Sequence, residues 1–374
     1  MNKFWRALLL SVLTSLSACQ QADGPAQKVV TALSDTDIAG YERAVQTREF
    51  SFPEDHGAHP GFKHEWWYLT GQVRDPQGRR FGYQFTLFRR ALSPKTLPRP
   101  SAWATNQIYL AHLALTDISG KRFFNDERYA RAALQLAGVQ ISPFRAWLED
   151  WSLTERAAPC AQCLQVTLQA KSAEFSLKLE LRNRRNPVLH GDRGLSRKSD
   201  TPGNASYYYS YPRLLTEGNI IVNGSQYTVS GNSWFDHEWS TSALETEQTG
   251  WDWFSLQLSD QSELMLFRLR HKDPKQSRYS ATLVTDEAVH NLDNERLVLH
   301  VQNYWRSPHS KIRYPLSWKI EIPSIDTSLS LTPLLADQEM NLSFRYWEGA
   351  VQIGGRHRGH NVSGGGYMEL TGYR

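Results

Sequence analysis

The sequence predicts an all-β protein made of two tandem antiparallel β-barrels, and three observations lead to this prediction. From residue 65 onward, short runs of alternating apolar and polar residues are separated by turn signals, as in antiparallel strands. Aromatic residues make up 12% of the 374 residues, and such wide side chains suit the faces of β-sheets. One hairpin pattern occurs twice, near residues 66 and 251, which indicates a duplicated β-domain.

Composition and motif content exclude several classes of protein. The 42 Lys and Arg against 38 Asp and Glu leave a formal net charge of +4 without a basic stripe, so no nucleic-acid partner is expected. A mean hydropathy of −0.53 excludes a polytopic membrane protein. The sequence has no Gly-x-Ser-x-Gly elbow, no Gly-x-Gly-x-x-Gly turn and no Walker-type Gly-Lys-Ser/Thr. We therefore expect no serine-hydrolase chemistry and no cofactor.

The N-terminus has the features of a bacterial lipoprotein signal. Basic residues precede an apolar run, Ala7–Leu16, that is too short to span a bilayer. The run closes with Leu16-Ser17-Ala18-Cys19, which resembles the lipobox, where the cysteine becomes the lipid-modified first residue. We predict a signal peptide at residues 1–18, a lipid anchor on Cys19 and a tether over residues 19–47. By the same resemblance, Gln20 favours the outer membrane, on the periplasmic side of the envelope.

The other two cysteines, Cys160 and Cys163, form a C-x-x-C pair. In an oxidising periplasm such a pair is expected to form a local disulfide. A redox-active pair would be expected between a strand and a helix, and a zinc site would need a second pair of ligands. Both alternatives stay open, but the disulfide is the prediction, and no metal site is predicted.

The first domain, residues 48–243, begins with a hairpin. Strands at 66–74 and 80–89 flank Asp75-Pro76-Gln77-Gly78, which has Pro and Gly at positions that suit a β-turn. Asn223-Gly224, between short apolar runs, marks a later hairpin. Between the two hairpins we expect strands at 108–116, 147–153, 164–169 and 175–181, and one helix near 126–136. The stretch 183–211, with its cluster of tyrosines at 207–211, is expected to be a long functional loop.

The second domain, residues 244–374, repeats the opening hairpin. The segment Trp66–Asp75 matches Trp251–Asp260 in order, through Trp, aromatic, apolar, hydroxyl, Gln, aliphatic and Asp positions. Each segment turns into a strand that ends in Leu-Phe-Arg. The domain boundary therefore falls near residue 244, and the second copy is long enough to close a small barrel.

Candidate chemistry gathers in segments that mix histidine, acidic residues and tryptophan. These segments are His64-Glu65-Trp66-Trp67, Asp236-His237-Glu238-Trp239 and Trp251-Asp252-Trp253. Because side chains alternate across a strand, Asp236 and Glu238 should share one face, and His237 and Trp239 the other. The nearby histidines at 56, 59 and 64 have spacing that is weak support for a metal site, because most such histidines are structural.

These segments resemble the AttH/CrtC family of lipocalin-like proteins. The resemblance rests on residues 52–68, 207–214, 231–240, 250–254 and 346–351, which follow in order over residues 50–374. It implies two tandem lipocalin-like antiparallel β-barrels, in agreement with the repeated hairpin. The family includes hydroxyneurosporene synthase, a carotenoid 1,2-hydratase that uses no redox cofactor, and secreted members labelled as hydrolases.

The resemblance also implies a set of site residues. Adding water to a C=C bond needs an acid and a pocket that tolerates a carbocation. The candidate acids are Asp236, His237, Glu238 and Asp252, and the candidate ligand-binding residues are Trp66, Tyr208, Trp239 and Trp251. We expect the pocket in the first barrel or at the junction of the two, bounded by residues 207–211 and 236–239.

Two functions remain open from the sequence. The first is an envelope lipoprotein that binds a hydrophobic small molecule, a lipid or isoprenoid, and serves an ABC-type transporter. The alternative is a cofactor-free hydratase of isoprenoid or carotenoid C=C bonds. Because carotenoids are made on the cytoplasmic side, the lipoprotein leader argues against a carotenoid substrate more than against the pocket.

Overall fold

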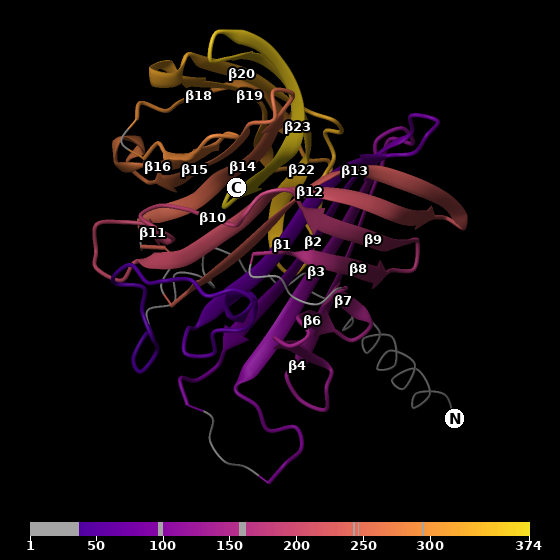
Figure 1. Ribbon diagram of the computed structural model, residues 1–374, viewed down its shortest axis with the longest axis vertical. Helices are drawn as coiled ribbons and strands as arrows, with labels where there is room; N and C mark the ends of the chain where they lie inside the picture. Colours follow the sequence, from indigo (N-terminus) through magenta and orange to yellow (C-terminus); the bar gives the residue numbers. More distant parts are fainter. Residues whose placement is uncertain (1–36, 96–99, 157–161, 242–243, 246, 294) are drawn as a thin grey trace, which may run out of the picture.

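The computed structural model describes residues 37–374, except 96–99, 157–161, 242–243, 246 and 294, and is almost entirely β-structure (Figure 1). The predicted signal peptide, Cys19, the start of the tether and Cys160 lie outside these residues. Cys163 is disulfide-bonded. In the described part of the chain, no helix is long and apolar enough to span a membrane.

The end of the predicted tether is part of the folded body. Tyr41 Oη donates to the carbonyl of Ala91 at 3.1 Å, and Ala44 is buried against the first core. The prediction of a tether as far as residue 47 is therefore wrong, because Tyr41 and Ala44 are buried against the first domain.

The first sheet is antiparallel and has thirteen strands. Eleven follow one another in the order β4-β3-β2-β1-β13-β12-β9-β8-β7-β6-β5, and β10 and β11 both pair with β12. After the 3₁₀ helix η1 (Glu54–His56), the strands are β1 (His64–Arg74), β2 (Arg80–Ala91), β3 (Gln107–Asp117), β4 (Arg122–Arg131), β5 (Ala137–Gln140), β6 (Arg145–Leu148), β7 (Trp151–Glu155), β8 (Gln165–Lys171), β9 (Phe175–Asn183), β10 (Val188–Leu189), β11 (Leu195–Arg197), β12 (Ala205–Val222) and β13 (Ser225–Ser240).

The second sheet is antiparallel and has ten strands. Nine follow one another in the order β17-β16-β15-β14-β23-β22-β20-β19-β18, and β21 pairs with β22. The strands are β14 (Gln248–Leu258), β15 (Glu263–His271), β16 (Arg278–Val284), β17 (Val289–Asn291), β18 (Val298–Arg306), β19 (Arg313–Ile322), β20 (Thr327–Pro333), β21 (Glu339–Asn341), β22 (Arg345–His357) and β23 (His360–Thr371). Two 3₁₀ helices, η2 (Pro274–Gln276) and η3 (Pro323–Ile325), interrupt them.

The two sheets share one topology. In each sheet the opening hairpin, β1–β2 or β14–β15, continues outward into the next strands of the chain. The first strand of each hairpin also pairs with the last strand of its own sheet, β13 or β23. The matching hairpins of the sequence therefore occupy matching positions, and each sheet curls into a barrel-like body (Figure 1). The fold class predicted from the sequence is confirmed.

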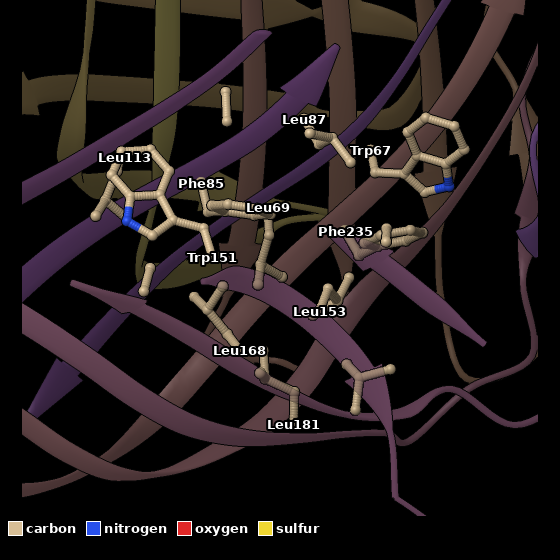
Figure 2. Close-up of a cluster of buried hydrophobic side chains, with 14 of the residues drawn as sticks. Trp67, Leu69, Phe85, Leu87, Leu113, Trp151, Leu153, Leu168, Leu181 and Phe235 are labelled. Carbon is tan, nitrogen blue, oxygen red and sulfur yellow. The ribbon is translucent and has the colours of Figure 1, made fainter. Parts of the chain in front are cut away.

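Alternate residues of the opening hairpin face two different environments. Trp67 and Leu69 point into the first core, where they meet side chains from the far strands such as Trp151 and Leu168 (Figure 2). Phe254, which matches Leu69 in the repeat, and Leu256 on the same face of its strand point into the second core. The opposite face of each hairpin is turned toward the other domain, and β22 and β23 lie against β1 and β2 (Figure 1).

Two equivalent glutamines tie the domains together. Gln72 Nε2 donates to the carbonyls of Val351 and Gly366 in the second sheet, both at 2.8 Å. Gln257, which matches Gln72 in the repeat, donates to Pro212 at 2.8 Å and to Ser233 at 3.0 Å in the first sheet. Ser233 and Gly366 pair with equivalent positions of the two hairpins, so the contact is reciprocal, as in an isologous interface.

Three predictions about local structure are wrong. Residues 126–136 do not form a helix, because Asp126–Arg131 belong to the edge strand β4, whose side chains are only partly buried and so lack clean alternation. The expected strand 147–153 is a tight hairpin of β6 and β7, turned at Glu149 with φ +55°. The tyrosine cluster at 207–211 is not a loop, because β12 begins at Ala205 and pairs there with β13.

Candidate active site between the two sheets

A cavity of about 990 Å³ lies between the outer faces of the two opening hairpins. This volume is at the upper end of what small-molecule sites in proteins enclose. Its walls are mostly apolar and come from both domains, and its aromatic members include Trp66, Tyr68, Phe88, Tyr208, Trp251, Trp253, Phe267 and Tyr346. The junction of the two domains was one of the two places expected for the site.

Asp236 on β13 is a buried carboxyl group in the wall of the first domain. It accepts hydrogen bonds from Trp234 Nε1 at 2.6 Å and Tyr208 Oη at 2.8 Å, and Ser210 Oγ is a third donor. Burial raises the pKa of Asp236 to about 7, although these three donors act in the opposite direction. At neutral pH this carboxyl group is therefore poised between its two protonation states.

Glu348, which is buried, and Glu369, which is half-buried, form a pair of carboxyl groups in the wall of the second domain. They are register partners on β22 and β23, so their side chains point to the same face of the sheet. Burial raises the pKa of Glu369 to about 7. Burial, and next the charge of Glu369, raise the pKa of Glu348 well above its usual range. Because two adjacent negative charges repel, ionisation of Glu369 opposes ionisation of Glu348.

Asp236 and Glu369 are equivalent residues of the two domains. Asp236 lies opposite Tyr68 on β1, and Glu369 lies opposite Trp253 on β14. Tyr68 and Trp253 match in the repeated hairpin, and their rings are in edge contact at 5.2 Å. The charges of Glu348, Glu369 and Asp236 all help to raise the pKa of Tyr68, after burial, so this hydroxyl group lies near the carboxyl groups of both walls.

The cavity receives five of the residues predicted from the sequence. Asp236, Trp66, Tyr208, Trp251 and Glu238 all line it. Glu238 is held by Lys198 Nζ at 2.8 Å and by Ser206, which fits an ion-paired carboxylate better than a proton donor.

Three other predicted residues do not face the cavity. His237 and Trp239 point into the first domain, where Trp239 is part of the apolar core and His237 Nε2 lies 2.9 Å from Glu65. Asp252 points into the second domain and is paired with Arg268 and Arg270. The alternation of side chains across a strand explains the outcome, because neighbours of cavity residues must face the cores.

His59, Glu65 and His237 are the described residues whose potential ligand atoms converge within 4.8 Å. Their atoms are already joined to one another, since Glu65 Oε1 lies 2.7 Å from His59 Nδ1 and 2.9 Å from His237 Nε2. Glu65 Oε2 accepts from Arg89 Nε at 2.6 Å, and His59 Nε2 lies 3.0 Å from Asp55. These contacts form a closed ion-pair network, and the donor set gives no reason to place a metal ion there.

Sequence reasoning missed Glu348, Glu369 and His112. Glu348 lies inside the segment 346–351 that carried the family resemblance, but no role was given to it. Glu369 could have been found by extending the repeat to the last strands, because Tyr367-Met368-Glu369 repeats the aromatic, apolar and acidic order of Trp234-Phe235-Asp236. His112 had no signal in the sequence, because β3 brings it to the cavity only after the sheet has formed.

Comparison with known proteins shows which proteins resemble this chain in sequence and in fold. The sequence pattern of the AttH-like family matches residues 43–373. A crystal structure assigned to AttH from Nitrosomonas europaea is 32% identical, with a TM-score of 0.78 over 89% of this chain and 100% of that one. Kievitone hydratase from Nectria haematococca shares the fold at 12% identity, with a TM-score of 0.65 over 89% and 98% of the two chains.

One curated relative is similar in sequence. It is the dehydratase asqC of Emericella nidulans, 23% identical over 198 residues, which are 50% of this chain. The match spans about half of that relative, 55% of its length. Relatives of this chain thus include proteins named for adding or removing water. Because the family pattern covers nearly all of the described residues, the chain belongs to the AttH-like family.

Proposed function

We propose that this protein is a cofactor-free hydro-lyase, which adds water to, or removes it from, a C=C bond of a largely apolar substrate held between the two domains. One observation carries the proposal: three carboxyl groups with raised pKa values, the buried Asp236 and Glu348 and the half-buried Glu369, face a single, mostly apolar cavity. A carboxylic acid kept protonated near neutral pH is what alkene protonation requires. The names of two relatives, a hydratase and a dehydratase, support the same reaction class.

The walls suggest a division of roles between the two domains. The Glu348–Glu369 pair holds a shared proton and donates it to one alkene carbon. The adjacent carbon then carries positive charge, which the faces of Trp66 and Trp251 stabilise by about 0.5–2 kcal/mol each. Water forms the new C–O bond and passes one proton to Asp236. Dehydration follows the same path in reverse.

The three donors around Asp236 fit the role of base. Ser210, Trp234 and Tyr208 all donate to this carboxyl group, so they favour its ionised form. The Glu348–Glu369 pair instead gains from holding a proton, because two adjacent negative charges repel. An acyclic isoprenoid or another lipid alkene is the substrate class that suits the mostly apolar walls.

The test uses an acyclic isoprenoid alkene in ¹⁸O-labelled water, with incorporation of the label followed by mass spectrometry. We expect Asp236→Asn, Glu348→Gln and Glu369→Gln each to lower the rate by about 10²–10⁴-fold. Glu339→Gln is the matched control, because Glu339 is equally buried but bonds Ser307, Ser310 and Tyr314 away from the cavity. Full activity in all three cavity variants would refute the assignment.

The same cavity supports a second candidate function, the carriage of a hydrophobic ligand, because its apolar walls would bind a lipid whether or not it reacts. A carrier would retain the isoprenoid unchanged, with no label incorporated by the wild type. We further propose, from the sequence alone, that Cys19 anchors the protein to the periplasmic side of the outer membrane. On that proposal an ABC-type transporter is a candidate partner.

A further inference from the structure

A line of polar groups runs from the buried Glu348 toward the protein surface. Tyr346 on β22 points to the same side of the strand as Glu348, and the charge of Glu348 helps, after burial, to raise the pKa of Tyr346, so the two groups lie close together. Tyr346 Oη lies 2.7 Å from Nδ1 of His112 on β3. On the other side of the imidazole ring, His112 Nε2 lies 3.5 Å from Glu127 Oε2 on β4. These four side chains therefore follow one another across the domain interface.

The two ends of this path differ in their access to water. The His112 side chain is 1% exposed, whereas the Glu127 side chain is 19% exposed. Glu127 accepts hydrogen bonds from Ser343 and from the exposed Tyr129, so it is fixed at the rim of the cavity. The path thus begins at Glu127, which solvent reaches, and ends at Glu348, which is 3% exposed and lines the cavity.

His112 Nε2 is the atom that indicates proton transfer along the path. It is buried, it faces Glu127 at a distance too long for a good hydrogen bond, and it has no other hydrogen-bond partner among the described residues. Burial lowers the pKa of His112, so the ring is neutral and one of its nitrogens carries a lone pair. With Nδ1–H donating to Tyr346, that lone pair is on Nε2 and open to a proton from Glu127 or from a bridging water.

We propose that Glu127, His112 and Tyr346 form a proton relay that returns a proton from solvent to the Glu348 carboxylate. This inference rests on the proposed hydro-lyase function. One proton arrives at His112 Nε2 as another leaves Nδ1 for Tyr346 Oη. Tyr346 at the same time gives its own hydroxyl proton to the Glu348 carboxylate. The relay leaves Tyr346 neutral and changes only the tautomer of His112. In dehydration, the proton moves along the same groups in the opposite direction.

The experiment measures proton exchange directly and needs no substrate. Protein is transferred into D₂O near pH 7, and the C=O stretch of the protonated carboxylic acid is followed by time-resolved infrared spectroscopy as it shifts on deuteration. Loss of the band in Glu348→Gln identifies it. We expect His112→Phe to slow the shift by about tenfold or more, equivalent to about 1.4 kcal/mol in the barrier. His112→Gln and Tyr346→Phe, which preserve more of the packing, should slow it as well.

The control is His357→Gln, because His357 is also buried but bonds Thr327 in the second domain, away from the cavity. An unchanged exchange rate in His112→Gln and Tyr346→Phe would overturn the relay and leave the acid role of Glu348 intact. A band that survives in Glu348→Gln would instead show that Glu348 is not the protonated group. That result would count against the proposed function itself, so the two failures are distinguishable.

Discussion

Replacing Glu369 by Gln tests the central physical claim, that the cavity stabilises a protonated carboxyl group. Burial raises the pKa of Glu369 from 4.5 to about 7. The folded protein therefore binds this proton more tightly than the unfolded chain does. The resulting stability is full below pH 4.5 and is lost as the pH rises through about 7. The Gln side chain has nearly the same shape and cannot ionise, so it removes this pH dependence.

The size of the stability effect follows from the rise in the pKa of Glu369. Each tenfold change in an ionisation constant is worth about 1.4 kcal/mol, so the rise from 4.5 to about 7 is worth about 3 kcal/mol. We expect Glu369→Gln to be close to the wild type in free energy of unfolding near pH 5. It should become more stable than the wild type by up to about 3 kcal/mol near pH 8.

The assay is urea unfolding followed by tryptophan fluorescence at several pH values between about 5 and 8. Glu127→Gln provides a control of opposite sign, because the hydrogen bonds to Glu127 lower its pKa despite partial burial. That variant should be less stable than the wild type by a nearly constant amount over this range. If the difference between Glu369→Gln and the wild type does not change with pH, the reasoning about the buried carboxyl pair is wrong.

Three further predictions concern other parts of the chain. Gln72→Ala or Gln257→Ala should each destabilise the domain interface by about 1–3 kcal/mol, because two carbonyl groups lose their donor. Differential scanning calorimetry would reveal the weaker interface as a single early unfolding step of one domain. Cys19→Ser should move the protein from the membrane fraction to the periplasm, and unchanged membrane recovery would exclude the anchor. Cys163 should resist alkylation until a reductant is added, and Cys160 should become reactive in the same step if it is the partner.

The strands that the sequence predicted well are those with one face in a core. In β1 and β14, apolar residues alternate with residues that face the other domain, so both the elements and their faces could be assigned. The edge strand β4 was taken for a helix because neither of its faces is fully buried. Apolar and polar residues alternate clearly only along a strand that has one face packed against a core.

The site was predicted in part for a similar reason. Asp236 could be found because it lies in a segment dense in aromatic and ionisable residues. Its counterpart Glu369 lies more than a hundred residues away in a glycine-rich strand, and Glu348 and His112 come from two further strands. Pairing of β22 with β23, and docking of the two sheets, bring these groups together. A single sequence does not show those long-range pairings.

The reciprocal glutamine contact has a consequence for how such a site could arise. Two identical subunits joined by this interface would line their shared cleft with the same group on both sides, and each mutation would change both sides at once. Linking the copies in one polypeptide removes that constraint. One copy could then acquire a second carboxyl group at Glu348 while the other kept Ser210, its partner across from Asp236, at the matching place. Two linked copies can thus line one cleft with a carboxyl pair on one side and a single carboxyl group on the other, which two identical subunits cannot do.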